Sequence, residues 1–169
     1  MLMKVFPHGT GEGDKPSRYL VRPDYPGRDT APPQVLRGDP AMTRALVDSI
    51  ERRWKFTSGV LSWHPDDKVS EEQEEEVMDA FEQVAFAGLE ADQRNILWVR
   101  HTHAGHHELH FLIPRLELSS GKDFNACPPG WQKDFDVFRD LFNWREGWAR
   151  PDDPARARDE LPKKADLFK

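Results

Sequence analysis

Residues 95–116 read NILWVRHTHAGHHELHFLIPRL, and this stretch decides the fold of the chain. Two apolar runs flank a polar stretch that contains Gly105, a pattern that predicts two β-strands joined by a tight turn. We place the strands at 95–101 and 107–114. Five of the seven histidines fall within ten positions of this hairpin, together with Glu108. The apolar runs therefore supply a packed scaffold, and the imidazoles supply groups that bind metal ions or exchange protons.

The turn suggests how the two strands pair. If Ala104 and Gly105 form a two-residue turn, His101 lies directly opposite Glu108. Because side chains alternate along a strand, Glu108 and His110 share one face, and His101 joins them there. Three ligands from two paired strands leave coordination positions open for a substrate, as a catalytic metal site requires. The sequence thus predicts a metal centre formed by these three side chains.

The mixture of imidazole and carboxylate suits Mn, Fe, Ni, Zn or Co, whereas an all-oxygen Mg or Ca site is less natural, although catalysis tolerates Mg. We expect His103 and His106 on the same side of the turn, as alternative ligands or as supports for the ligands, and His107 on the opposite face. The competing interpretation is that these histidines are exposed turn residues or an adventitious metal trap. The phasing of two of them with Glu108 between apolar positions favours a dedicated site.

Away from the hairpin, the sequence predicts three more strands and four helices. The strands lie at 1–6, 34–37 and 56–63, with the second at a sheet edge. The helices lie at 17–21, at 40–53, from a capping box at Ser70 and Gln73 to Gly88, and at 131–148. Helical spacing assigns these buried faces in the last three helices: Met42, Ala45, Leu46, Ser49 and Ile50; Val77, Met78, Phe81, Val84 and Ala85; Trp131, Phe135, Phe138, Leu141, Phe142 and Trp148.

Composition indicates a soluble globular chain. With 169 residues, 37% hydrophobic and 32% charged, we expect one domain over 1–150 and a polar tail over 151–169 that reads like the start of a further region. No apolar run is long enough to insert into a membrane. The single cysteine, Cys127, forms no internal disulfide, which favours a reducing, cytoplasmic location. The net charge of −6 argues against a general nucleic-acid coat protein, although the first 55 residues are mildly basic.

The chain contains only two tyrosines, Tyr19 and Tyr25. A phenol attacks a phosphodiester once a metal ion polarises the phosphate, which gives a covalent intermediate. Tyr19 is predicted on a short helix behind the glycine-rich stretch HGTGEGDKP, beside Arg18 and Arg22. From position alone, a packing role for Tyr19 is the stronger interpretation.

The hairpin and its flanks resemble a known family. The segment from Trp98 to Lys122 reads WV-x-H-x6-E-L-x-F-x-I-P-x-x-E-L…GK, which resembles the MobA/MbeA-type mobilisation relaxases of small colicin-type plasmids. These belong to the wider class of HUH-like endonucleases. The resemblance extends in the same order to PSRYL (16–20), TSGVLSW (57–63) and FRDLFNW (138–144), so it covers most of the chain.

The resemblance implies an α+β fold, with a central, mainly antiparallel five-stranded sheet and helices packed on it, and the predicted strand count agrees. The order of the strands does not follow from the sequence. The implied activity is that of a metal-dependent nicking and joining endonuclease. It cuts one strand at a plasmid transfer origin and forms a 5′-phosphotyrosyl adduct for conjugative mobilisation. Tyr19 is then the nucleophile. The implied cofactor is a divalent ion, with Mn or Mg preferred and Ni, Co or Zn as options.

The subgroup carries a metal motif spaced H-x6-E-x-N, and His101 and Glu108 fit it. The third position is His110 rather than Asn, which keeps a metal ligand but leaves the preferred metal open. The general base for Tyr19 is not evident, and His103 or the metal itself are candidates.

The resemblance also implies partners, namely single-stranded origin DNA, accessory mobilisation proteins, and a coupling protein with its type IV secretion system. Arg18, Arg22 and Lys122 are candidate contacts to DNA phosphates. Two other interpretations remain open at this point. One is a rolling-circle replication-initiator nickase, and the other is a non-catalytic metal-binding or DNA-binding module.

Overall fold

The computed structural model describes residues 1–153 and contains one five-stranded antiparallel sheet. From residue 154 onward, the tail expected over 151–169 lies outside the described residues. The strand order is β1-β3-β5-β4-β2, so the hairpin occupies interior positions and β1 and β2 form the edges. The strands are β1 (Leu2–Val5), β2 (Gln34–Arg37), β3 (Phe56–Ser62), β4 (Leu97–His101) and β5 (Glu108–Pro114). The α+β fold and the edge position of β2 are therefore confirmed.

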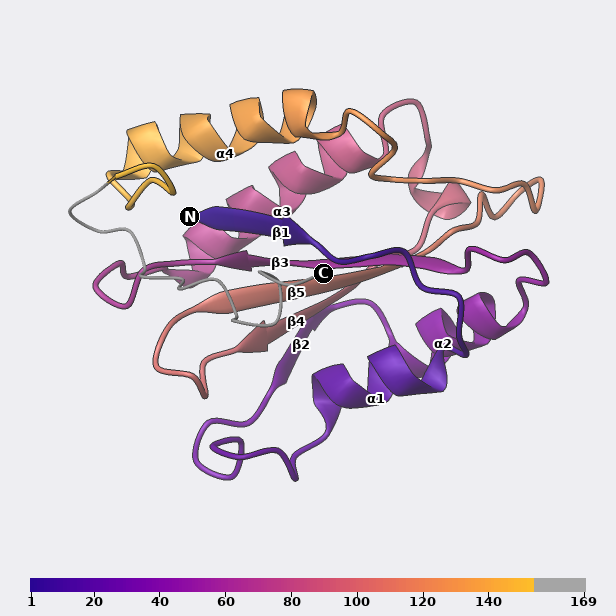
Figure 1. Cartoon of the computed structure of the whole chain (residues 1–169), viewed down its shortest axis with the longest axis horizontal. Coiled ribbons are helices and arrows are strands. Elements are labelled where there is room, and N and C mark those ends of the chain that lie inside the picture. The colour runs from indigo at the N-terminus through magenta and orange to yellow at the C-terminus, as the bar shows by residue number, and fades with distance from the viewer. Residues whose placement is uncertain (154–169) are drawn as a thin grey trace, which may run out of the picture.

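Helices cover both faces of the sheet, as Figure 1 shows, with α3 and α4 on one side and α1 and α2 on the other. Their bounds are α1 (Asp14–Val21), α2 (Pro40–Asp48), α3 (Glu71–Ala85), the short 3-10 helix η1 (Ala91–Gln93) and α4 (Gln132–Glu146). None of the helices described is both long and apolar enough to cross a membrane. The main core lies beneath α3 and α4, and a smaller one lies beside α1.

Alternation along the hairpin strands divides the two cores. Trp98 and Phe111 form a cross-strand pair on the α3 side, where both contact the ring of Phe81. Leu97, Val99 and Leu112 belong to the smaller core on the other face. Because each of these strands is buried on both faces, it reads as a nearly continuous apolar run. On the side of the sheet that α1 covers, His101, Glu108 and His110 interrupt the apolar runs of β4 and β5.

Only part of the predicted buried face of α2 was correct, because Ile50 is buried and Leu46 is half-buried, whereas the other three predicted positions are exposed. Thr43, Val47 and Ile50 are buried, whereas Met42 is 53% exposed, and Ala45 and Ser49 are also exposed. The hydroxyl of Thr43 donates to Asn95 Oδ1 at 2.7 Å, so a polar side chain takes the inward position. Helical spacing then places Val47 and Ile50 inward and turns Met42 to solvent. The helix also ends at Asp48 rather than at residue 53.

The other helices agree more closely. α3 begins at the predicted capping box and buries Val77, Met78, Phe81 and Ala85, with Val84 partly buried against them. In α4 the inward position of Leu141 was wrong, because this side chain is 57% exposed. Asn143 is buried instead, and its side chain accepts a bond from the Met1 ammonium at 2.7 Å and donates to the Met1 carbonyl at 2.9 Å. α4 ends at Glu146, although Trp148 beyond it is buried as expected.

The hairpin has the predicted register but not the predicted turn. His101 pairs with Glu108, and Val99 pairs with His110. Pairing stops there, so the connection spans residues 102–107 rather than two residues. Gly105 takes a positive φ of 80° and its amide donates to the Thr102 carbonyl, which closes the tip of this loop. Within this longer loop, His106 contacts Glu108 and His103 packs beside Tyr25.

Cys127 gives a first testable expectation. Its thiol is buried, and burial raises its pKa to about 12. Because the thiolate is the reactive form, we expect iodoacetamide to leave Cys127 unmodified in the folded protein at mildly alkaline pH and to modify it rapidly in denaturant. Intact mass spectrometry over time measures both rates. Rapid modification under native conditions would contradict the described burial.

Candidate functional site

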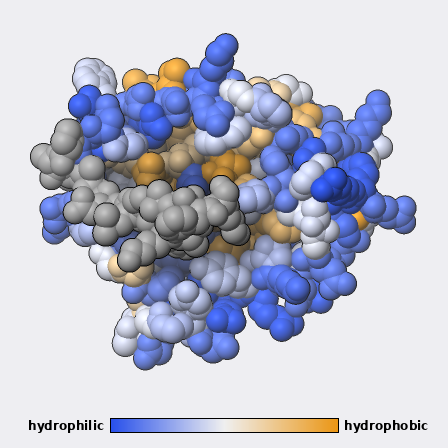
Figure 2. Space-filling view, viewed as in Figure 1, coloured by the Kyte–Doolittle hydropathy of each residue, from blue (hydrophilic) through white to orange (hydrophobic). Residues whose placement is uncertain are grey.

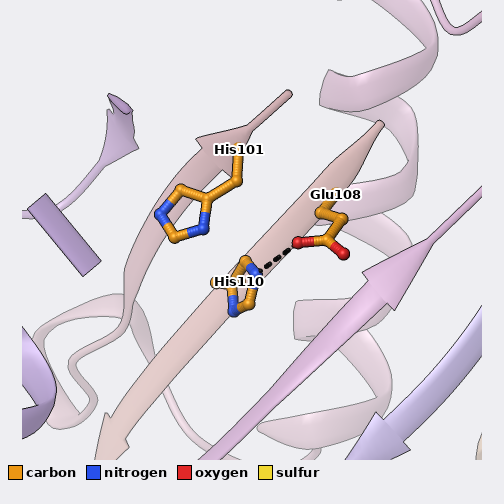
Figure 3. A group of neighbouring side chains, drawn as sticks. All are labelled: His101, Glu108 and His110. Atoms are coloured by element: carbon orange, nitrogen blue, oxygen red, sulfur yellow. Dashed lines mark hydrogen bonds and ion pairs between the residues drawn. The ribbon is translucent and has the colours of Figure 1, made fainter. Parts of the chain in front are cut away.

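Three side chains gather at the end of the hairpin on the face that α1 covers. His101 ends β4, while Glu108 and His110 lie on β5. One potential ligand atom from each lies within 4.8 Å of the others. Figure 3 shows the three side chains converging from the two strands, with His110 and Glu108 in direct contact. The structure thus brings together the three residues that the sequence selected as metal ligands.

The imidazole ring of His101 is fixed in one tautomer and one orientation. The ring is only 1% exposed, and its Nε2 lies 2.7 Å from the carbonyl oxygen of Leu20 on α1. A carbonyl only accepts, so Nε2 carries the proton and Nδ1 has the lone pair. Burial, followed by the nearby His110, lowers the pKa of His101 to about 4. The ring is therefore neutral at physiological pH, as metal binding requires.

Glu108 is the carboxylate of the cluster and is bonded on both oxygens. His110 Nε2 lies 2.9 Å from Oε2, and His106 Nε2 lies 2.6 Å from Oε1. Burial opposes ionisation of this carboxyl, but the hydrogen bonds from His110 and His106 outweigh it and lower the pKa to about 2. Glu108 is therefore ionised at neutral pH. His106 comes from the loop and anchors the oxygen that faces away from His110.

The two other histidines of the hairpin have separate positions. The His103 ring lies 5.3 Å from the His101 ring and 5.5 Å from the Tyr25 ring, measured between centroids. Burial and the positive charge of Arg28 lower the pKa of His103, and its Nδ1 is buried without a hydrogen-bond partner. His107 points to the opposite face of the sheet, as expected, where its Nε2 meets Glu74 of α3 at 3.2 Å.

Tyr19 lies beside the cluster rather than in the core. Its side chain is 42% exposed, and its ring centroid is 6.4 Å from that of His101. Tyr19 and His110 also line one largely apolar cavity of about 160 Å³, together with Phe6 and Leu20. The ring of Tyr25 packs edge-on against that of Tyr19 at 5.8 Å. Both tyrosines therefore belong to the surroundings of the His101, Glu108 and His110 cluster.

The glycine-rich stretch positions α1 by close packing. A side chain at Gly9 would overlap the ring of Phe56, and one at Gly13 would lie 2.9 Å from the Arg44 carbonyl oxygen. The Gly13 amide also donates to Asp48 Oδ1 at 2.8 Å. These contacts tie the start of α1 to β3 and α2, and so fix where Tyr19 meets the sheet.

Of the three residues predicted to contact DNA phosphates, two lie beside Tyr19 and one lies far from the cluster. Arg18 and Arg22 flank Tyr19 on α1 and its end, and they form ion pairs with Asp14 at 3.1 Å and Asp24 at 3.5 Å. Lys122 is exposed and follows the far end of β5. A strand of this length spans about 20 Å, so Lys122 is not brought to the cluster.

Arg28 is the residue of this site that the sequence reasoning missed. It is 0% exposed, and its Nη1 donates to the carbonyl oxygens of Tyr19 at 2.6 Å and Arg22 at 3.0 Å. Its Nη2 lies 3.5 Å from His101 Nδ1. The guanidinium carbon lies 5.0 Å from the ring centre of Tyr19 and 4.7 Å from that of Tyr25. An arginine in a Pro-rich loop carries no sequence signal of burial.

The pKa of His101 predicts a loss of stability in mild acid. The unfolded chain protonates this residue near its ordinary value of 6.5, but the folded chain does so only near 4. Between these values the unfolded state binds more protons, so stability is full above pH 6.5 and is lost as pH falls through 4. We expect the unfolding free energy of the metal-free protein to drop by up to about 3 kcal/mol. Urea unfolding across this range measures the loss, and an equal loss in His101→Asn would contradict the assignment.

The donor set fits a catalytic divalent metal. The Nε2–H of His101 donates to the carbonyl oxygen of Leu20, which is the usual support of a metal-bound histidine and leaves Nδ1 for the ion. Glu108 is ionised and oriented by a second histidine. Two imidazoles and one carboxylate leave positions open for substrate oxygens. The arrangement is therefore suited to polarising a bound phosphate or carbonyl group.

Comparisons with known proteins agree with this site. The model of the relaxase family described as MobA/VirD2-like, nuclease domain, matches residues 40–143. The cryptic plasmid protein C of Neisseria gonorrhoeae is 40% identical over 159 residues, which cover 92% of this chain and 75% of that protein. DNA relaxase MbeA of Escherichia coli is 34% identical over 168 residues, which cover 96% of this chain but only 32% of that protein. These similarities confirm the resemblance seen in the sequence, and the chain belongs to the MobA/VirD2-like relaxase family.

Proposed function

We propose that this chain is the nicking domain of a plasmid relaxase, which cuts one strand at the transfer origin by transesterification to Tyr19. The observation that carries the proposal is the position of Tyr19 beside the cluster of His101, Glu108 and His110. Family membership and the similarity to DNA relaxase MbeA support the reaction class. We assign the domain to residues 1–150, as the sequence suggested.

His101, Glu108 and His110 would hold the divalent ion, for which Mn or Mg is preferred and Ni, Co or Zn is compatible with the ligands. When bound, the ion withdraws negative charge from the scissile phosphate. Glu108 keeps its charge because His106 continues to donate to its second oxygen. His101 keeps its orientation through the Leu20 carbonyl. The contacts that orient Glu108 and His101 would thus remain in place with the ion bound.

The bond changes centre on Tyr19. Its phenolic oxygen forms a bond to phosphorus, and the bond from phosphorus to the 3′ oxygen breaks. Tyr19 gives up its proton and the departing 3′ oxygen gains one, so the protons balance. His103, whose Nδ1 has no hydrogen-bond partner, is the candidate acceptor. Because one phosphodiester replaces another, the reverse reaction at the same site rejoins the strand.

Single-stranded DNA at the origin is the proposed substrate. Arg18 and Arg22 flank Tyr19 in the sequence, and they are the proposed contacts to phosphates beside the cut. Lys122 would contact DNA only at a distance from the cluster. Accessory mobilisation proteins and a coupling protein with its secretion system are the further partners that this function requires.

The test is a covalent shift on a denaturing gel. The full chain is incubated with single-stranded oligonucleotides that carry candidate transfer origins, in Mn²⁺ or Mg²⁺, with an EDTA control. A label at the 3′ end should move with the protein, whereas a label at the 5′ end should appear in a free fragment. Cleavage only of replication-origin sequences would instead indicate an initiator nickase. Metal and DNA binding with no covalent product would indicate a non-catalytic module.

A further inference from the structure

The charge of Arg28 has no acidic counterpart in the part of the chain that is described. Its guanidinium is fully buried, and its contacts are two carbonyl oxygens at the end of α1, the faces of two tyrosine rings and His101. Its Nε has no hydrogen-bond partner. Burying a cation without an anion is costly, although carbonyl groups at a helix end offset part of the cost. The site therefore contains a fixed positive charge that no carboxylate neutralises.

This charge lies next to the proposed metal position. Because Nε2 of His101 is bonded to the Leu20 carbonyl, Nδ1 is the atom left for a metal ion, and Arg28 Nη2 is 3.5 Å from it. A divalent ion bound there must displace this contact and remain close to the guanidinium. Glu108 is the cluster's single carboxylate. The two positive charges of the ion and the one of the guanidinium would then face the single negative charge of Glu108. Charges interact more strongly in these buried surroundings than in water.

We propose that the positive charge of Arg28 lowers the affinity of the DNA-free site for the metal ion. The metal ion and a DNA phosphate then bind cooperatively. A phosphodiester supplies the missing negative charge, and the ion and the DNA then strengthen each other's binding by the same factor. This inference rests on the proposed function and adds to it how binding of the metal ion depends on binding of DNA. The relaxase would bind metal weakly when free and firmly only with a strand in place.

A purely structural role for Arg28 makes a different prediction. Nη1 donates to one carbonyl oxygen in the last turn of α1 and to another just beyond it, so the residue also stabilises the end of that helix. Loss of that contact alone would loosen α1 and weaken metal binding. The orientation of His101, however, also depends on the Leu20 carbonyl at 2.7 Å and on complete burial of the ring. Removing the charge should therefore tighten metal binding.

The experiment compares Arg28→Met, which removes the charge at similar length, with Arg28→Lys, which keeps it. Isothermal titration with Mn²⁺ measures the affinity of each 169-residue chain, and thermal unfolding with near-ultraviolet circular dichroism tests the fold. We expect Arg28→Met to bind Mn²⁺ about tenfold more tightly than wild type, and Arg28→Lys to bind like wild type. Binding by Arg28→Met that is no tighter than wild type overturns the proposal.

The second arm repeats the titrations with a short oligothymidylate. Wild type and Arg28→Lys should gain Mn²⁺ affinity when the oligonucleotide is present, and Arg28→Met should gain much less. Unchanged affinity of wild type overturns the cooperative loading without involving any variant. If none of the three proteins binds Mn²⁺ in either arm, the metal centre of the proposed function fails, which is distinct from failure of the Arg28 inference.

Discussion

We expect that replacing Tyr19 by phenylalanine abolishes covalent attachment of this protein to DNA and leaves its fold and metal affinity unchanged. The variant lacks only the hydroxyl, and the ring keeps its contacts with Tyr25, His101 and Arg28. The side chain is 42% exposed, so no buried hydroxyl is lost. Removing the attacking atom of a covalent mechanism reduces the rate by at least about a thousandfold. The measurement is adduct formation with a single-stranded origin oligonucleotide, with thermal unfolding as the test of fold.

Tyr25→Phe is the matched control. Tyr25 packs against the same ring and the same guanidinium, so its substitution disturbs the same neighbours and also removes one hydroxyl. We expect Tyr25→Phe to form adducts at a rate close to that of wild type. If Tyr19→Phe still forms adducts and Tyr25→Phe does not, then the nucleophile is Tyr25 and our assignment is wrong.

Replacing Glu108 by glutamine removes the only negative charge of the cluster. The amide is nearly the same size, but it is neutral and cannot accept bonds from His106 and His110 on both sides. We expect Mn²⁺ affinity to fall by at least about a hundredfold, since losing a ligand should cost more than losing a supporting contact. Isothermal titration of the DNA-free protein measures the effect, and nicking should fall in parallel.

His106→Gln is the matched variant for the supporting contact. His106 bonds the Glu108 oxygen that faces away from His110, so its loss should weaken Mn²⁺ binding by about tenfold rather than a hundredfold. Separate substitution of His110 should behave like that of Glu108. If both ligand variants bind normally while His103 and His106 variants do not, the metal site lies on the loop instead.

Local patterns predicted the hairpin well. The alternation of apolar and polar residues in 95–116 was enough to place His101 opposite Glu108 and to put His107 on the other face. Turn length was predicted less well, because His106 contacts a side chain on the strand and His103 packs against a tyrosine from another segment. Contacts of this kind depend on segments far apart in the sequence.

The errors share one physical cause. Met42 and Leu141 are apolar and suitably spaced, yet both face solvent, because buried polar contacts of Thr43 and Asn143 set the rotation of their helices. Strand order could not be predicted either, since pairing of β3 with β5 joins segments that are separated in the sequence by a long helix. Arg28 was missed for the same reason, because only the assembled fold buries it.

The proposed metal ligands and Tyr19 lie on elements of different kinds, the ligands on interior strands of the sheet and Tyr19 on a short helix. The proposed metal ligands belong to β4 and β5, which are paired on both sides within the sheet. Such interior strands are the last to open, so the ligands stay rigid. Tyr19 instead sits on an eight-residue helix and is partly exposed. If Tyr19 is the nucleophile, its half-exposed side chain is the part of the site that can turn aside with the attached strand and return for the sealing step, while the ligands stay in place.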